Sequence, residues 1–410
     1  MIKINLLNSS VATAIALSGS ALAGDVIAEA PAAAPSNNGD WCAGFNTVGK
    51  FYENKDAPFI QSLKFSGRFQ YQYAHIDGEG VDGESFSEDI DEVRRFRFGS
   101  EIKFLNGFKL KGNMNLVNDG AKSGGTREFE HKDWDELTLS YSKKDVAGFD
   151  KAGLSYGRHK VAMGHESHTS SKKIKTVERS SLSNKIYDER WTGVKLKLEE
   201  GNWEGIIGYF SQDDKKERDA WGSLSQGSAF YLSSAWELNS GNLLFDFFHM
   251  SDDEDADPDM NDYNWAASLA YETEIGNWDL MVNVVYGDNG DSNYQSNAER
   301  EGNFYGLVVM PSTYLIDDKL EFVARYVYQA SEGDEGIRAN SRYFRTPDEI
   351  GEADMNGGRG DSYHSIYAGL NYYLCGNNSK VQVGAEYETL DTADGDANNT
   401  TLWAAYRMYF

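Results

Sequence analysis

Three histidines are the first side chains whose type and spacing could bind a metal. His159, His165 and His168 lie in one stretch, and the last two have the His-x-x-His spacing that some zinc sites use. No third strong ligand stands near them, so incidental histidines of a solvated loop are the favoured interpretation. We therefore expect no metal site and no cofactor.

An acidic run follows later in the chain, from Asp252 to Asp257. It lacks the glycine and the terminal glutamate that a calcium loop has at fixed offsets. We interpret it as a solvated loop, open to loosely held divalent cations. The Arg359-Gly360-Asp361 tripeptide matches an adhesion motif, but three residues in a glycine-rich loop arise easily by chance.

No arrangement typical of an enzyme is visible in the sequence. We find no Ser-His-Asp order and no glycine-rich phosphate loop between a strand and a helix. An outer-membrane lipase would need a serine and a histidine near the lipid-facing rim on adjacent strands, and no such pair is convincing. The sequence predicts that the protein is not an enzyme.

Basic side chains recur at alternate positions, and this spacing has a direct chemical consequence. From Leu63 to Tyr73 the odd positions are apolar or glycine, and the even positions include Lys64 and Arg68. Alternate residues of a strand share one face, so such cations form a row. A row of cations beside water attracts anions. The full set on the matching faces is Lys64, Arg68, Arg95, Arg97, Lys109, Lys111, Lys195 and Lys197.

The elements that carry these rows are predicted to be membrane-crossing strands. About sixteen segments alternate in this way, each near the roughly ten residues that a tilted strand needs to cross a bilayer. An even number closes an antiparallel sheet with both termini on one side. The segments begin near Gln61, Asp91, Gly107, Asp133, Lys151, Asp188, Asn202, Ser228, Gly241, Asp262, Asn277, Glu301, Asp318, Ser362, Ser379 and Thr400.

The connections between the segments alternate strictly in length. Short turns such as Asn106-Gly107 and Gly276-Asn277 separate long polar stretches such as His75–Ile90 and Ser331–Asp361. A barrel with one rim in the periplasm and the other outside the cell sorts its loops in this manner, whereas a soluble sandwich has no reason to do so. We therefore predict an all-β fold, a transmembrane antiparallel β-barrel in the bacterial outer membrane, in contact with its lipid.

Composition agrees with such a barrel. The chain has 410 residues with 13% aromatics, and its mean hydropathy is −0.58. Beyond the N-terminus it has no apolar run long enough for a membrane-spanning helix. The formal net charge of −26 disfavours nucleic acid as a partner, because nucleic-acid binding needs a basic surface.

The two ends of the chain carry export and assembly signals. Residues 1–23 read as a signal peptide, residues 24–60 as a periplasmic tether with a short helix between Trp41 and Asp56, and residues 61–410 as the barrel. The last strand ends on Phe410, which resembles the signal that the barrel-assembly machinery reads.

The two cysteines leave a pairing question open. Cys42 precedes the first strand and Cys375 lies in a short turn, so both are expected at the periplasmic rim, where oxidation is permitted. Because the first strand meets the last, a Cys42–Cys375 disulfide and two free thiols are both compatible with the sequence.

A family resemblance adds to this reading. The Arg94–Gly99 strand, the Gly157–Glu166 stretch and the Thr169–Ser180 stretch together resemble the phosphate-selective porins O and P, over roughly residues 61–200. The resemblance implies a passive porin, a homotrimer, and a long third loop that folds into the barrel and narrows it. If this loop folds inward, four more cations join the pore-lining set: Lys172, Lys173, Lys175 and Arg179.

Acidic side chains on the same faces leave the selectivity open. Glu101 and Glu136 could neutralise part of the basic row. The later strands carry a further acidic set: Asp246, Glu272, Asp279, Glu321, Glu386 and Glu388. A basic wall opposite an acidic wall is typical of a general diffusion porin. We expect a channel for small hydrophilic solutes with an anion preference, phosphate being one candidate, and the alternative is a surface adhesin or receptor that uses the barrel as a scaffold.

Overall fold

The structure is a computed structural model, and it describes residues 41–117, 129–186, 190–211, 228–251, 263–291 and 297–410. The expected signal peptide, most of the expected tether and the Asp252–Asp257 run lie outside these residues. Within the described parts of the chain, none of the helices is long and apolar enough to span a bilayer.

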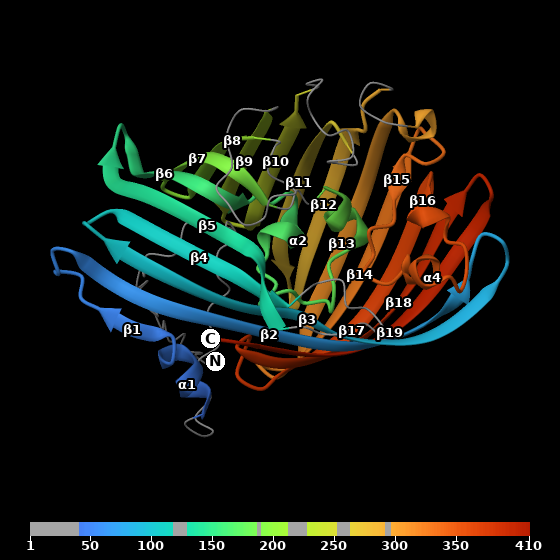
Figure 1. Cartoon of the computed structure of the whole chain (residues 1–410), viewed down its shortest axis with the longest axis horizontal. Coiled ribbons are helices and arrows are strands. Elements are labelled where there is room, and N and C mark those ends of the chain that lie inside the picture. Colours follow the sequence, from blue (N-terminus) through green and yellow to red (C-terminus); the bar gives the residue numbers. More distant parts are fainter. Residues whose placement is uncertain (1–40, 118–128, 187–189, 212–227, 252–262, 292–296) are drawn as a thin grey trace, which may run out of the picture.

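The described residues form a closed antiparallel barrel of sixteen strands (Figure 1). The last strand closes the barrel against the first, with Tyr409 opposite Arg68 and Asn398 opposite Glu79. The predicted fold is therefore confirmed. The barrel strands are β2 (Ile60–Glu79), β3 (Ser85–Phe104), β4 (Phe108–Val117), β5 (Phe129–Val146), β6 (Phe149–Lys160), β7 (Arg190–Glu200), β8 (Trp203–Phe210), β9 (Ala229–Leu238), β10 (Gly241–Met250), β11 (Trp265–Ile275), β12 (Trp278–Asp288), β13 (Asn303–Ile316), β14 (Leu320–Ser331), β17 (Ser362–Tyr373), β18 (Ser379–Thr392) and β19 (Gly395–Tyr409).

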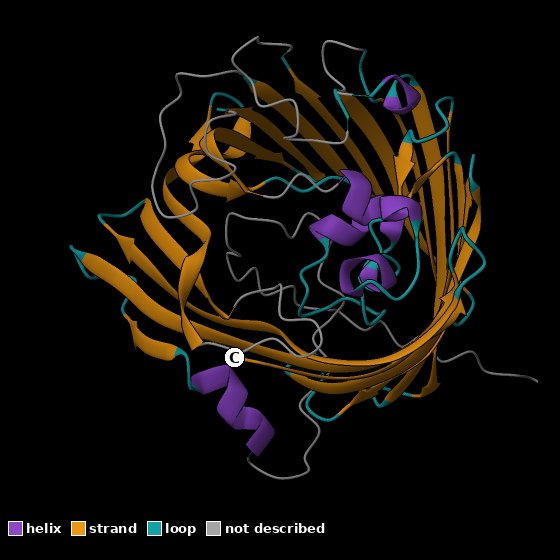
Figure 2. Cartoon of the chain, turned by 45° about the vertical axis from the view of Figure 1, so that its right-hand side comes forward, coloured by secondary structure: helices purple, strands orange, loops and turns teal. Residues whose placement is uncertain are grey.

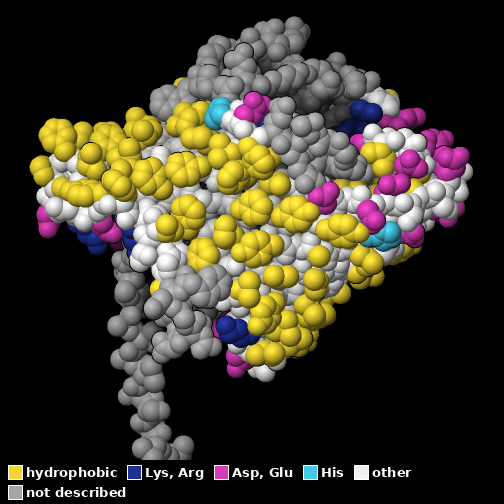
Figure 3. Space-filling view, turned by 60° about the horizontal axis from the view of Figure 1, so that its bottom comes forward, with side chains coloured by type: hydrophobic (Ala, Val, Ile, Leu, Met, Phe, Trp, Pro, Cys, Tyr) yellow, Lys and Arg dark blue, Asp and Glu magenta, His cyan; other side chains and the backbone are white. Residues whose placement is uncertain are grey.

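Alternation along each strand decides which side chains face outward. On β19, Leu402 is 49% exposed whereas Arg407 is fully buried, and on β6 Leu154 is 55% exposed. Apolar side chains cover much of the outer surface of the barrel (Figure 3). The inner face carries charged and polar side chains such as Arg407, together with buried apolar side chains such as Phe304 and Val327 that belong to one cluster with Leu182 and Ile186.

Two outer connections are shorter than the sequence suggested. The expected long stretch His75–Ile90 is mostly strand, because β2 continues to Glu79 and β3 begins at Ser85. Polar pairs across the two strands extend the ladder: Asp89 Oδ1 lies 2.6 Å from Tyr73 Oη and 2.8 Å from His75 Nδ1. The connection from β18 to β19 is also short, so the strict alternation of loop lengths was wrong beside the seam between β2 and β19.

The N-terminal segment adds a strand that the sequence did not reveal. After α1 (Trp41–Thr47), the short strand β1 (Lys50–Glu53) pairs with β2 through Lys50 opposite Lys64. The main chain of Phe410 pairs with Gly67 by two hydrogen bonds of 3.2 Å, and the Phe410 ring occupies the space where a side chain at Gly67 would lie. β1 therefore covers the edge of β2 just beyond the end of β19.

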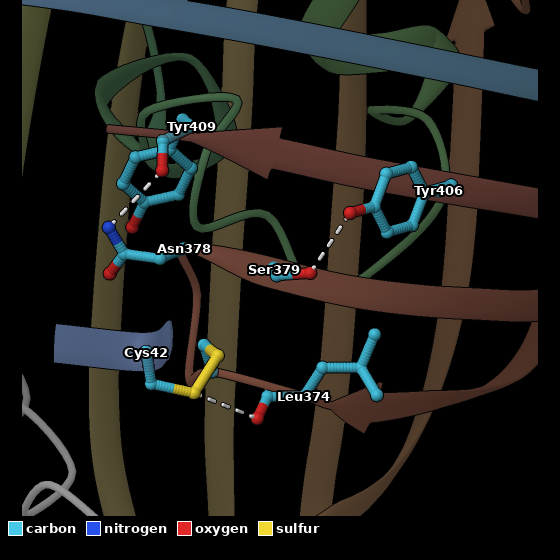
Figure 4. Close-up of a disulfide and its surroundings, with 7 residues drawn as sticks. Cys42, Leu374, Asn378, Ser379, Tyr406 and Tyr409 are labelled. Atoms are coloured by element: carbon cyan, nitrogen blue, oxygen red, sulfur yellow. Dashed lines mark hydrogen bonds between the residues drawn. A yellow bond between two sulfur atoms is a disulfide. The ribbon is translucent and has the colours of Figure 1, made fainter. Parts of the chain in front are cut away.

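A disulfide joins the N-terminal segment to the barrel. Cys42 of α1 is bonded to Cys375 in the turn after β17, with a Cα–Cα distance of 5.4 Å (Figure 4). Asn378 in the same turn donates a hydrogen bond of 3.2 Å from Nδ2 to the carbonyl oxygen of Tyr409. One turn thus contacts both ends of the described chain.

Outer connections carry further short elements. The connection after β6 contains α2 (His165–His168) and α3 (Ser181–Ile186), and the one after β12 contains η1 (Ala298–Arg300). The stretch expected as a plain polar loop, Ser331–Asp361, instead buries Tyr343, Phe344 and Met355 completely. Its elements are β15 (Ile337–Arg338), α4 (Thr346–Ile350), η2 (Asn356–Gly358) and β16 (Arg359–Gly360).

Candidate functional site

The candidate site is built from the connection between β6 and β7, which we call the third loop (residues 161–186), and from the inner faces of the strands around it. Side chains of β10, β12, β14, β17, β18 and β19 bind this loop. In Figures 1 and 2 its helices are drawn among the barrel strands.

One contact fixes the beginning of the third loop to β10. Asp246, fully buried, accepts a hydrogen bond of 2.9 Å at Oδ2 from the backbone nitrogen of Gly164, and its Oδ1 lies 2.9 Å from His168 Nε2. Gly164 has φ +74°, and a Cβ there would lie 2.7 Å from Asn283 Oδ1, so glycine is required. His165 faces Glu272 at 3.5 Å. Both histidines therefore pair with acids, and no cluster of three metal-ligand side chains occurs in the described chain.

The middle of the third loop is held by a lysine that points to the later strands. Lys175 Nζ lies 2.7 Å from Asp279 Oδ2 and 3.3 Å from Glu321 Oε1. Burial alone would lower the pKa of Lys175, but the carboxylates of Glu321 and Asp279 outweigh it and raise this pKa. Lys172 is similarly directed, with Nζ 4.4 Å from the centre of the Tyr409 ring.

Cations of the later strands bind backbone carbonyls of the same loop. Lys380 Nζ donates to the carbonyl oxygen of Ile174 at 2.7 Å, and Arg325 Nη1 donates to that of Glu178 at 2.8 Å. Arg407 donates to the carbonyl oxygen of Val177. All three cations have no more than 1% exposed area. The later strands thus satisfy backbone groups that burial would otherwise leave unpaired.

A β-bulge in β3 supplies a further cation to the third loop. Arg95 pairs with Gln70 and Val93 with Tyr71, so Arg94 is the extra residue between them. The bulge lets both Arg94 and Arg95 turn inward. Arg94 Nε lies 2.7 Å from Glu178 Oε1, and Arg95 Nη1 donates to Gln70 Oε1 at 2.9 Å.

The electrostatic consequence appears at Glu178. Burial alone would raise the pKa of Glu178, but the guanidinium groups of Arg94, Arg95 and Arg407 outweigh it and hold this pKa well below its ordinary value. Glu178 therefore stays ionised beside the arginines.

Each acidic residue expected on the later strands has a partner in the structure. Asp246, Glu272, Asp279 and Glu321 contact the third loop as described, and Glu386 Oε1 lies 2.9 Å from Arg325 Nη2. Glu388 Oε1 accepts a hydrogen bond of 2.6 Å from Tyr363. We call this acidic set together with Arg325, Lys380 and Arg407 the docking wall.

The expected lysines of the earlier strands gather on a second surface, which we call the basic wall: Lys64 of β2, Lys109 and Lys111 of β4, and Lys195 and Lys197 of β7. Acids pair with part of this set. Lys111 Nζ lies 2.8 Å from Glu136 Oε2, Lys197 Nζ lies 2.5 Å from Glu204 Oε2, and Lys109 Nζ lies 3.8 Å from Glu101 Oε2. Among the described residues, neither Lys64 nor Lys195 forms an ion pair.

Two expected arginines are divided between strands and loop. Arg97 Nη1 lies 2.8 Å from Asp135 Oδ2. The other carboxylate oxygen of Asp135 binds Arg190. Arg68 Nη1 donates to Ser171 Oγ of the third loop at 2.6 Å, and its buried Nε has no hydrogen-bond partner.

The remaining expected loop cations stay near the loop itself. Arg179 donates from Nε to the carbonyl oxygen of Glu166 at 2.6 Å and from Nη2 to that of Thr169 at 2.8 Å. Lys173 is half-buried, next to Lys172. Arg179 thus acts within the loop, whereas Lys172 and Lys175 reach the later strands.

Sequence reasoning missed several residues of the docking wall. Arg325, Lys380 and Arg407 stand at inward positions of their strands, so alternation could have identified them. Arg94 gives no such signal, because only the bulge turns it inward. Glu166 and Glu178 lie in a loop, where no periodicity applies.

Comparisons with known proteins agree with this architecture. No curated protein matches the sequence. Among solved structures, the outer membrane channel DcaP of Acinetobacter baumannii is similar with a TM-score of 0.53 at 14% identity, over 87% of this chain and 99% of that one. An anion-selective porin from Comamonas acidovorans gives 0.53 at 10% identity, over 85% and 99%. OmpT of Vibrio cholerae gives 0.52 at 11% identity, over 84% and 97%. At these identities the likeness shows the fold.

The family assignment rests on sequence. The model of the family described as phosphate-selective porin O and P matches residues 63–287, more than half of the chain. This stretch includes β3 with its bulge, the third loop and all of the basic wall. The protein is an integral barrel of the outer membrane. The chain belongs to the phosphate-selective porin O and P family.

Proposed function

We propose that the protein is a passive outer-membrane channel that prefers anions, with the third loop folded inward to narrow the path. The observation that carries this proposal is the occupation of the acidic residues on the later strands. Asp246 and Glu321 are at most 1% exposed, and each lies against a group of the third loop. A permeating ion would therefore meet neither of these two carboxylates, whereas Asp279 and Glu272 keep 39% and 26% of their side-chain area exposed beside cationic or imidazole partners of the third loop.

The basic wall supports the same sign of selectivity. Lys195 is half-buried, and its Nζ donates a hydrogen bond of 3.4 Å to the carbonyl oxygen of Lys160 at the end of β6. Cations that line a water-filled constriction raise the local anion concentration and lower the entry barrier for anions. The solved Comamonas acidovorans structure is described as an anion-selective porin, which agrees with this proposal.

Phosphate remains one proposed solute among the anions. Arginine forks suit phosphate because they donate two parallel hydrogen bonds. Arg68, which is half-buried and contacts the third loop, is the candidate residue for such a contact. We also propose a homotrimer, an N-terminal signal peptide over residues 1–23 and a periplasmic tether over residues 24–60.

The adhesin alternative receives less support from the outer loops. The long connection Ser331–Asp361 packs on the third loop: Asn184 Nδ2 donates to the carbonyl oxygen of Asn340 at 2.8 Å, and Lys185 Nζ to that of Gly336 at 3.3 Å. A loop held down on the barrel presents little surface for a partner.

The reversal potential of the purified protein in a planar bilayer tests the proposal. In a KCl gradient we expect the sign of the potential to indicate chloride over potassium, although the net charge is −26. Exposed loop charges more than about 10 Å from the path are largely screened at 0.1 M salt. Addition of phosphate should reduce chloride current if phosphate binds. A cation-selective wild-type channel would contradict the anion preference.

A further inference from the structure

Arg325 of β14 occupies a central place between the barrel and the third loop. Its side chain is fully buried. Its Nη1 lies 2.9 Å from Glu166 Oε1, 2.8 Å from the carbonyl oxygen of Glu178 and 3.2 Å from Thr176 Oγ1. One guanidinium group therefore binds the third loop at two places that are ten or more residues apart in sequence.

These two places are also joined to one another within the loop. Glu166 accepts hydrogen bonds from the backbone nitrogen of Ser180 at 3.2 Å and from the Ser180 hydroxyl. Arg179 closes the same junction by donating to the carbonyl oxygen of Glu166. Glu166 is thus the point at which the internal fold of the loop meets the barrel wall.

The other side of Arg325 is attached to neighbouring strands. Nη2 lies 2.9 Å from Glu386 Oε1 on β18, which also accepts a hydrogen bond of 2.8 Å from Ser365 on β17. The guanidinium carbon lies 5.5 Å from the centre of the Tyr367 ring. A planar fork with fixed donor directions can satisfy the loop and the wall at once, which the single ammonium of lysine cannot do.

The remaining wall contacts each reach one part of the loop. Asp246 binds Gly164 and His168 in the first half, and Lys380 binds Ile174 in the second. Arg325 binds both halves. Loss of Arg325 would also leave Glu166 and Glu386 buried without their cation, a strongly unfavourable state that favours separation of loop and wall.

We propose that Arg325 is a positioning residue, which fixes the distance between the third loop and the wall and so sets the width of the channel. This inference rests on the proposed function, in which the space left beside the loop is the solute path. It concerns width, whereas the sign of selectivity depends on the basic wall.

The experiment compares Arg325→Met and Arg325→Lys with a matched control, Arg300→Met. Arg300 forms an ion pair with Glu335 at 3.1 Å between two outer loops, and the third loop binds the carbonyl oxygen of the next residue, Gly336, without using this pair. Single-channel conductance is measured with polyethylene glycols of increasing size, and the largest polymer that still lowers the conductance reports the width. Because a loop released from the docking wall moves into the path beside the basic wall, Arg325→Met should show lower conductance and a cutoff shifted to smaller polymers. Arg325→Lys should show a smaller shift in the same direction, and Arg300→Met no shift.

A second variant keeps the proposal testable if Arg325→Met does not form a barrel. Glu166→Gln removes the charged partner on the loop side and should also move the cutoff to smaller polymers. In a double-mutant cycle, Glu166→Gln should change the cutoff of Arg325→Met only slightly, because both substitutions remove the same contact between Arg325 and Glu166. A folded Arg325→Met channel with the wild-type cutoff, or Glu166→Gln with that cutoff where Arg325→Met fails to fold, would overturn the proposal.

The reversal potential of the same channels separates this inference from the proposed function. A cation-selective wild-type channel whose cutoff moves in Arg325→Met would refute the anion preference and retain the role of Arg325. An anion-selective wild-type channel whose cutoff does not move in Arg325→Met would retain the anion preference and refute the role of Arg325.

Discussion

The docking wall and the basic wall are built from strands of the same alternating type, yet they use their charges differently. On the docking wall Arg325 lies between Glu166 and Glu386, and the exposed area of all three is near zero. On the basic wall the Lys111–Glu136 pair keeps 21% and 10% of its side-chain area exposed. The docking wall holds the third loop in place, and the basic wall borders the proposed solute path.

This difference explains how a protein with a net negative charge can line a solute path with basic side chains. The net charge of −26 counts every residue equally, whereas an ion responds to charges that are near and unpaired. The carboxylates of Asp246 and Glu321 are bound to groups of the third loop. Lys64 and Lys195 have no ion pair within the described residues, and we propose that a permeating anion meets their charge.

Reversal of charge on the basic wall should have the largest effect. The double variant Lys64→Glu, Lys195→Glu places two carboxylates beside the proposed path, and we expect the reversal potential in a KCl gradient to change sign toward potassium. The matched control is Lys143→Glu, Lys144→Glu, since these lysines are exposed near the periplasmic end of β5 and their field is screened. Equal shifts from both double variants would break the distinction between the two walls.

Removal of a charge from the docking wall should instead affect stability. Asp246→Ala leaves His168 and the backbone nitrogen of Gly164 without their acceptor. Loss of one partner from a buried pair typically costs about 3–5 kcal/mol. We expect a lower midpoint in the heat-dependent electrophoretic shift of the barrel. If Asp246 faced the solute path, as the acidic wall of a general diffusion porin would, the variant would keep its stability and become more chloride-selective.

The pair of Glu178 with Arg94 predicts a pH-dependent contribution. The pKa of Glu178 is depressed in the folded state, so its stabilising effect is complete above the ordinary carboxyl pKa of about 4.3 and is lost as the pH falls toward the depressed value. Glu178→Gln should therefore lower the thermal midpoint at neutral pH. The gap to wild type should narrow below about pH 4. A gap that is constant from neutral to acidic pH would exclude an ionic role for Glu178.

The disulfide should have the smallest effect on the channel. Cys42→Ser, Cys375→Ser removes the bond between α1 and the turn after β17 and leaves the side chains of both walls unchanged. Disulfides typically contribute about 2–4 kcal/mol, so we expect a modest fall in the unfolding midpoint of the oxidised protein. Conductance and reversal potential should match wild type, and a changed selectivity would mean that the N-terminal segment influences the path.

Much of the fold could be predicted because a barrel in lipid imposes a period of two residues on each strand. Sixteen strands follow from that period, and so does a position for Lys109 on the buried side of β4. The prediction failed where local pattern carries no information about pairing. β2 and β3 extend through polar residues such as His75 and Asp89, and β1 forms only because the edge of β2 is open beyond Phe410.

The site was less predictable than the fold for a related reason. A bulge shifts the register by one residue, so Arg94 turns inward against the expected alternation. The contacts of Lys175 with Asp279 and Glu321 join residues more than a hundred positions apart in sequence. The family resemblance placed Lys175 in the pore lining if the loop folds inward, but only the tertiary structure shows which wall it meets.

The most direct test of the two-wall account is the position of bound anions in crystals of the protein soaked in bromide. Anomalous scattering locates bromide without assumptions about conductance. We expect bromide peaks beside Lys64 and Lys195 of the basic wall, and none between the third loop and Asp246 or Glu321 of the docking wall. Bromide absent from the basic wall, with rubidium bound there in a parallel soak, would contradict it.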